Sequence, residues 1–105
     1  MSQLGDDPEV LFATPRRTVF LTLDAAVRAC ELATERGNVV YRVEGGIWHP
    51  GQGCEMRLDA IWDGEIAPAN DQALNSNNAR AAIMIATENE GCDTFVLSMK
   101  PTTRH

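Results

Sequence analysis

The chain has 105 residues, of which 44% are apolar and 23% are charged. This size and composition predict one globular domain, residues 1–105, with a single hydrophobic core. Fifteen acidic and nine basic side chains give a formal net charge of −6, which repels phosphate backbones and argues against direct nucleic-acid binding. No stretch has the roughly 20 apolar residues of a membrane span, and residues 1–15 lack the features of a secretory signal. We therefore expect a cytoplasmic protein that does not enter a membrane.

The cysteine pattern indicates a reducing environment and no metal site. Cys30, Cys54 and Cys92 are odd in number and form no CxxC, which argues against a disulfide framework and against a zinc site. All three lie in segments with an apolar pattern, so we expect buried, reduced thiols. No metal-binding or phosphate-binding motif is present, and we expect neither a metal nor another cofactor.

The N-terminal half predicts a strand followed by a helix. Residues 1–15 are interrupted by prolines and indicate a flexible lead, in which residues 10–12 could form a short edge strand. Residues 17–21 are typical of a strand. Thr22 is suited to cap a helix that ends before Gly37, where a glycine can adopt the left-handed conformation. The apolar stripe of this helix consists of Leu23, Ala26, Val27, Cys30 and Ala33.

The middle of the chain predicts two antiparallel strands. Residues 39–44 form the first, and residues 45–53, with four glycines and a proline, predict a long hairpin loop. Residues 54–63 alternate between apolar and charged side chains, which is typical of a strand with one wet face. The expected buried set is Cys54, Met56, Leu58, Ala60 and Trp62. The expected exposed set is Glu55, Arg57, Asp59 and Asp63, with Ile61 as the apolar exception.

A second helix is expected within residues 70–89, followed by a strand at 94–100 and a tail at 101–105. Its start is open between Asn70 and Ser76, because the run from Asn75 to Asn78 disfavours a helix interior. The element order is β-α-β-β-α-β. It predicts an α+β fold in which a mostly antiparallel sheet of four to five strands carries both helices on one face. A ferredoxin-like split βαβ is one way to arrange these elements.

Carboxylates concentrate on and around the alternating strand. The polar face of that strand would lie on the exposed side of the sheet, flanked by a tryptophan in the glycine-rich loop. Tryptophan is enriched at binding hot spots. An acidic surface of this kind suits a basic partner, because complementary charge speeds encounter and rejects wrong partners. Trp48 could equally fold back over the core edge. The predicted partner-binding residues are Glu44, Trp48, Glu55, Asp59, Asp63 and Glu65.

The whole layout resembles the small acidic immunity proteins of contact-dependent growth inhibition and related bacterial toxin systems. The resemblance rests on chain size, acidity, the strand–helix unit TVFLTLDAAVRACELATERG and the acidic strand EMRLDAIWDGE. It implies a tight one-to-one complex with a cognate toxin, often a nuclease, whose basic active site the acidic face would block. No catalytic residue is carried over, and we expect no enzymatic activity.

The sequence leaves two alternatives open, and it leaves the oligomeric state open as well. One is a self-associating α+β regulatory domain that binds a small ligand on its open sheet face. The other is a small thiol or hydrolytic enzyme that uses His49 and Cys54. Such a pair would need a lowered thiol pKa and an orienting third group.

Overall fold

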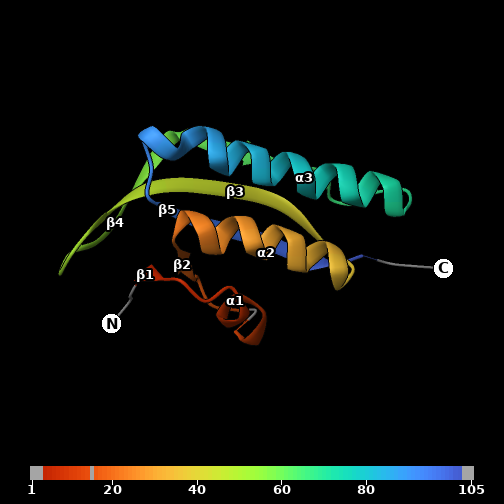
Figure 1. Ribbon diagram of the computed structural model, residues 1–105, viewed down its shortest axis with the longest axis horizontal. Coiled ribbons are helices and arrows are strands. Elements are labelled where there is room, and N and C mark those ends of the chain that lie inside the picture. Colours follow the sequence, from red (N-terminus) through yellow and green to blue (C-terminus); the bar gives the residue numbers. More distant parts are fainter. Residues whose placement is uncertain (1–3, 15, 103–105) are drawn as a thin grey trace.

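The structure, a computed structural model, describes residues 4–14 and 16–102. A five-stranded sheet carries the two long helices, α2 and α3, on one face (Figure 1). The elements in chain order are β1 (Leu4–Gly5), α1 (Glu9–Ala13), β2 (Phe20–Leu21), α2 (Leu23–Glu35), β3 (Asn38–His49), β4 (Gly53–Asp63), α3 (Asp71–Thr87), the 3-10 helix η1 (Glu88–Glu90) and β5 (Thr94–Pro101). The predicted α+β class and the β-α-β-β-α-β order from β2 onward are confirmed.

The sheet is mixed rather than antiparallel throughout. Its strand order is β1-β2-β5-β3-β4, in which β1 and β2 are parallel and all other neighbours are antiparallel. The β2–α2–β3 unit is therefore a split βαβ, with β5 rather than the next strand between its two strands. The last strand of the chain lies inside the sheet, and β4 forms one outer edge.

The N-terminal segment differs from the prediction. Residues 9–13 form helix α1 instead of a strand at residues 10–12, and the edge strand is β1. A local cause is the turn before α1, where Pro8 is already helical and Asp7 Oδ1 accepts a hydrogen bond from the backbone N–H of Glu9 at 3.0 Å. Leu11 on α1 is buried in the core. Residues 1–3 and Pro15 lie outside the described residues.

Helix α2 follows the predicted signals. Thr22 accepts a hydrogen bond from the backbone N–H of Ala25 at 3.4 Å, and Gly37 has a φ of 73° directly after the helix. Small side chains on the buried face of α2 bring it close to the sheet, where Phe95 and Leu21 are fully buried.

Helix α3 begins at Asp71, with Asn70 as its cap: Asn70 Oδ1 accepts from the backbone N–H of Ala73 at 2.8 Å. The run from Asn75 to Asn78 is helical after all. Asn77 and Asn78 are fully buried, and their side chains bond to the sheet instead of competing for the backbone of their own helix.

These two asparagines replace a missing strand beside β3. β4 ends opposite Arg42, so the earlier part of β3 has no strand neighbour on that side. Asn78 Oδ1 accepts from the backbone N–H of Val40 at 2.9 Å, and Asn77 Nδ2 donates to the carbonyl oxygen of Val40 at 2.8 Å. Asn78 also donates to the Asn38 carbonyl at 2.9 Å. The buried sheet edge is thereby satisfied by side chains of α3.

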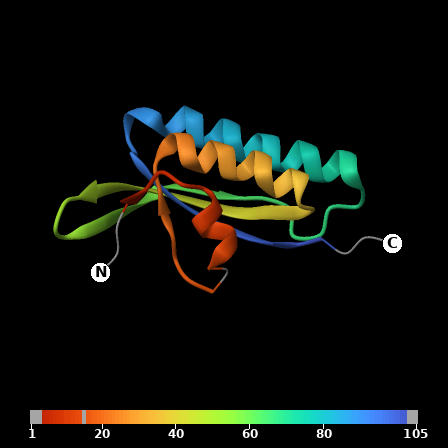
Figure 2. The same ribbon diagram turned by 60° about the horizontal axis from the view of Figure 1, so that its bottom comes forward.

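The hairpin of β3 and β4 is longer than expected. Gly45 and Gly46 do not interrupt β3, and the turn spans only residues 50–52. A Cβ atom on Gly45 would come within 2.8 Å of Cys92 Sγ, and one on Gly46 within 2.6 Å of the Glu55 carbonyl oxygen, so both glycines serve close packing. The hairpin projects beyond the helices (Figure 2).

The predicted buried face of residues 54–63 holds only in its second half. Ala60 is buried and Trp62 packs against the core, but the Leu58 side chain is 87% exposed. The reason is twofold: the first half of β4 lies on the projecting part of the hairpin, and residues 57–60 form an irregularity opposite Gly45.

The C-terminal segment is hydrogen-bonded to the fold two residues beyond the predicted strand, at Thr102. Pro101 belongs to β5, and Thr102 donates to the carbonyl oxygen of Gly37 through both its N–H and its Oγ1, each at 2.8 Å. Residues 103–105 of the predicted tail lie outside the described residues. None of the helices within residues 4–14 and 16–102 has the length and apolar character needed to cross a bilayer.

Candidate partner-binding surface

β4 carries three of the six predicted partner-binding residues along the outer edge of the sheet, and a fourth follows it. No strand pairs with the far side of β4 within the described chain, so this edge is open. The side chains of Asp59 and Asp63 are 76% and 68% exposed. Glu65 follows the strand and is also exposed. An open edge with charged side chains is protected against pairing with other strands, but it remains accessible to a partner protein with a complementary surface.

Glu44 and Asp63 flank one arginine on the outer face of the sheet. Arg42 Nη1 lies 3.1 Å from Asp63 Oδ1, and Arg42 Nε lies 3.7 Å from Glu44 Oε1. Glu44 is paired with Val96, the neighbour of the core residue Phe95, so Glu44 points away from the helices. This face is therefore a charged triad rather than a cluster of free carboxylates.

The remaining predicted carboxylates are also paired with basic groups. Glu55 Oε1 lies 2.9 Å from His49 Nε2. Asp59 lies 3.5 Å from Arg57, and Glu65 lies 3.9 Å from Arg80. Exposed pairs of this kind contribute at most about 1 kcal/mol each. A partner can therefore replace these basic side chains as ligands of the carboxylates at low cost.

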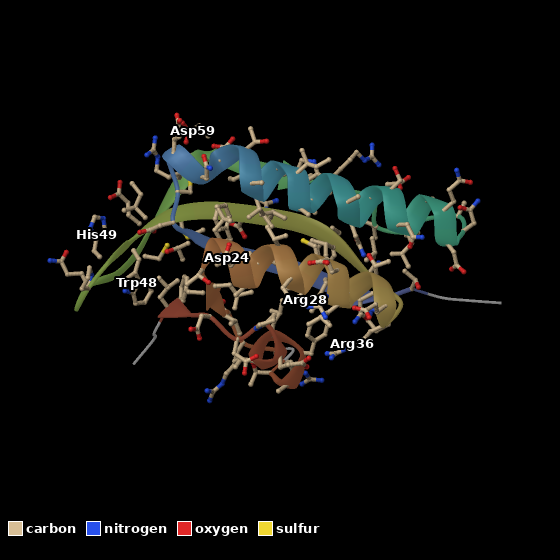
Figure 3. The ribbon with its side chains drawn as sticks, viewed as in Figure 1. Asp24, Arg28, Arg36, Trp48, His49 and Asp59 are labelled. Carbon is tan, nitrogen blue, oxygen red and sulfur yellow. The ribbon has the colours of Figure 1, made fainter. Side chains whose placement is uncertain are left out.

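The six predicted residues do not share one face. Register pairing places Trp48 opposite Cys54 and Ile47 opposite Glu55, so Trp48 and Glu55 point to opposite sides of the hairpin. Figure 3 shows Asp59 beside the C-terminal end of α3, and Trp48 and His49 farther out on the hairpin.

Trp48 has a structural contact. Its ring lies 5.7 Å from that of Phe20 at an interplanar angle of 54°, and its backbone N–H donates to Asp93 Oδ1 at 2.8 Å. These contacts tie the hairpin to β2 and to the start of β5. The side chain is still half-exposed, so it can contact a partner at the same time.

Apolar side chains border the open edge, which the alternating pattern did not predict. Besides Leu58, the side chains of Ile66 and Ile83 are 60% and 64% exposed. Arg80 lies one turn from Ile83 on α3 and reaches Glu65, which places this flank of the helix beside the end of β4. We call the combination the β4-edge surface: Leu58, Asp59, Asp63, Glu65, Ile66 and Ile83.

The structure does not assemble a His49–Cys54 nucleophile pair. His49 is paired with Gly53, and Cys54 follows Gly53 in the strand. The side chains of His49 and Cys54 therefore lie on opposite faces of the hairpin. Burial and the nearby carboxylate of Asp93 raise the pKa of the Cys54 thiol, which is the reverse of what a nucleophile requires. Within the described part of the chain, no three His, Cys, Asp or Glu side chains are grouped so as to hold a metal ion.

Thiol reactivity follows from these surroundings. Burial raises the pKa of Cys30 to about 12. At pH 8 its thiolate fraction is of the order of 10⁻⁴, so we expect no reaction of Cys30 with a disulfide reagent in the native protein. Unfolding in urea will make all three cysteines react. Modification of native Cys30 at the rate of a free thiol, located by mass spectrometry, would contradict its burial.

The same pKa shift makes stability depend on alkaline pH. The folded-state pKa of Cys30 lies above its unfolded value, so its contribution is fully present below about pH 9. It decreases as the pH rises from about 9 towards 12, because only the unfolded chain then releases the proton. A Cys30→Ala variant, which is less stable overall, will show a shallower loss of stability over this range in urea titrations.

No family model matches this chain. It is similar to the protein named Immunity protein CdiI of Burkholderia pseudomallei, with 43% identity over 83 residues that cover 79% of this chain and 75% of that protein. This relationship confirms the resemblance drawn from size, acidity and element order. The chain belongs to the CdiI immunity protein family.

Proposed function

We propose that this protein is an immunity protein that binds the toxin of its own system and neutralises it without any catalytic step. The membership of the chain in the CdiI family carries the proposal. A binding protein needs a firm scaffold and an accessible surface, and the β4 edge on its buried core supplies both.

The proposed contact is the β4-edge surface. It combines exposed carboxylates with the exposed side chains of Leu58 and Ile83, and protein interfaces use both apolar and charged contacts. Glu44 would contribute through the triad around Arg42, whereas Glu55 and Trp48 would contact the partner from the projecting hairpin.

The proposed partner is a basic toxin domain, a nuclease. An enzyme that acts on nucleic acid presents a cationic cleft to phosphates, and Asp59, Asp63 and Glu65 offer anionic groups in the same role. Each of them already holds an arginine at 3.1 to 3.9 Å, so its carboxylate is oriented for a guanidinium or ammonium group before binding. Occupation of the cleft would exclude the substrate.

Growth rescue tests the proposal. The toxin domain of this protein's own system is induced in a bacterial host that lacks both genes, with and without this protein. We expect growth arrest to be relieved only when this protein is co-produced, and an unrelated toxin to remain active. Persistent arrest in cells that contain the folded protein in excess over the toxin would refute the proposed function.

A further inference from the structure

The basic side chains of this acidic protein are not distributed evenly. Five of the arginines that the structure describes form ion pairs with carboxylates. Among the described residues, three cationic side chains have no such partner: Arg16, Arg17 and Lys100. All three are exposed, and all three line one groove.

This basic groove lies on the side of the sheet away from β4. It has a volume of about 420 Å³ and separates α1 and the segment 16–18 from the C-terminal half of β5. Phe12, Tyr41 and Val96 supply apolar lining between the cations. A site of this size with an apolar lining and a few charged groups is typical of one that binds a ligand or a peptide.

The edge of β5 that faces the groove is open. β2 has only two residues and pairs with β5 at a single position, Leu21 with Phe95, so no described strand continues along residues 97–101. The backbone N–H of Thr102 donates to the carbonyl oxygen of Gly37 on the β3 side. In an antiparallel ladder every second residue of β5, here Lys100, Ser98 and Val96, turns its backbone groups to the same side. The alternation turns the backbone N–H and C=O groups of Leu97 and Met99 towards the groove.

The positive charges of the groove decide which kind of extended segment could pair with the open edge of β5. A second copy of this chain would bring its own Arg16, Arg17 and Lys100 against the same side chains, and Pro101 removes one donor from the edge. An extended segment with carboxylates has neither difficulty. Its backbone can bond to Leu97 and Met99 while its acidic side chains meet the three cations.

We infer that the basic groove binds an extended, carboxylate-bearing segment of the cognate toxin, which adds as a strand to the open half of β5. The inference rests on the proposed function and adds a second contact of opposite charge on the opposite side of the sheet. The toxin would then be held at a basic groove as well as at the β4-edge surface, and a toxin that matched only one of them would bind weakly.

The test combines amide exchange with matched charge variants. In the complex with the toxin domain of its own system, we expect the amides of Leu97 and Met99 to become protected from hydrogen exchange. Lys100→Glu and Arg17→Glu should each weaken toxin binding at least tenfold. Arg28→Glu makes the same change in net charge on the exposed face of α2 and should change affinity less than twofold.

The outcomes separate the two proposals. If the toxin binds but Leu97 and Met99 stay unprotected, or if Lys100→Glu and Arg28→Glu bind equally well, the groove does not receive a toxin strand and the proposed function still stands. If the unaltered protein does not bind the toxin at all, both fail. Two further results would overturn the inference: a dimer that Lys100→Glu dissociates, or binding of a fluorescent single-stranded oligonucleotide that Lys100→Glu abolishes.

Discussion

Asn78→Ala will lower the free energy of unfolding by about 2–4 kcal/mol, because a buried polar group left without a partner costs about 1–3 kcal/mol. The substitution removes the acceptor for the Val40 N–H and the donor to the Asn38 carbonyl, both at a sheet edge that β4 does not cover. It also removes the donor to Thr34 Oγ1 at 3.0 Å. Urea unfolding followed by tryptophan fluorescence will measure the change.

Asn75→Ala is the matched control for this prediction. Asn75 lies one turn earlier on α3, is exposed and is the same residue type, and alanine favours a helix interior. We expect this variant to be within about 0.5 kcal/mol of the unaltered protein or slightly more stable. A similar effect of the two substitutions would show that Asn78 does not replace a strand partner of β3.

Reversal of charge at Asp59 and Asp63 together will weaken the toxin complex at least a hundredfold, about 3 kcal/mol. Both side chains are well exposed, so the substitutions Asp59→Lys and Asp63→Lys should leave the fold intact. In the complex each new lysine would face the basic groups proposed for the toxin, and the loss should diminish at high salt. Isothermal titration at two ionic strengths will measure it.

A control pair with the same change in net charge separates local contact from overall attraction. Asp24 and Glu31 are exposed on α2, which packs over β3, β5 and β2 rather than beside β4. Asp24→Lys together with Glu31→Lys should reduce affinity less than fivefold at moderate salt. If both pairs weaken the complex equally, the β4-edge surface is not the contact and only net charge matters.

Local signals predicted the elements whose ends depend on one or two side chains. Thr22 and Gly37 set the two ends of α2, because a side-chain cap and a left-handed glycine act within a single turn. The alternation around Ala60 and Trp62 predicted a half-buried strand correctly where helix α3 covers the sheet.

Tertiary contacts decided what local signals could not. The asparagine run on α3 disfavours a helix by propensity, but Asn77 and Asn78 gain hydrogen bonds to β3 that only the folded sheet provides. Gly45 and Gly46 are typical of a turn, but here they give space to Cys92 and Glu55 within a strand. Leu58 lies at a position that the alternation predicts to be buried, but no helix covers it and its side chain is exposed.

The candidate site was predictable in composition and not in arrangement. The alternating pattern identified Asp59 and Asp63 as exposed side chains, because a strand's period is two. The same alternation places Arg57 on the strand face of Asp59. The arginines beside Asp63 and Glu65 come from β3 and α3, which no spacing in the sequence indicates. Lys100 lies far along the chain from Arg16 and Arg17, so only the fold brings the three unpaired cations of the basic groove together.

In the proposed neutralisation, this protein occupies the active site of its toxin. We would titrate the nuclease activity proposed for the purified toxin with increasing amounts of this protein. We predict that activity falls linearly to zero at one equivalent, and that the Asp59→Lys, Asp63→Lys variant requires a large excess. Full toxin activity in a mixture that is shown to be completely complexed would rule out occupation of the active site.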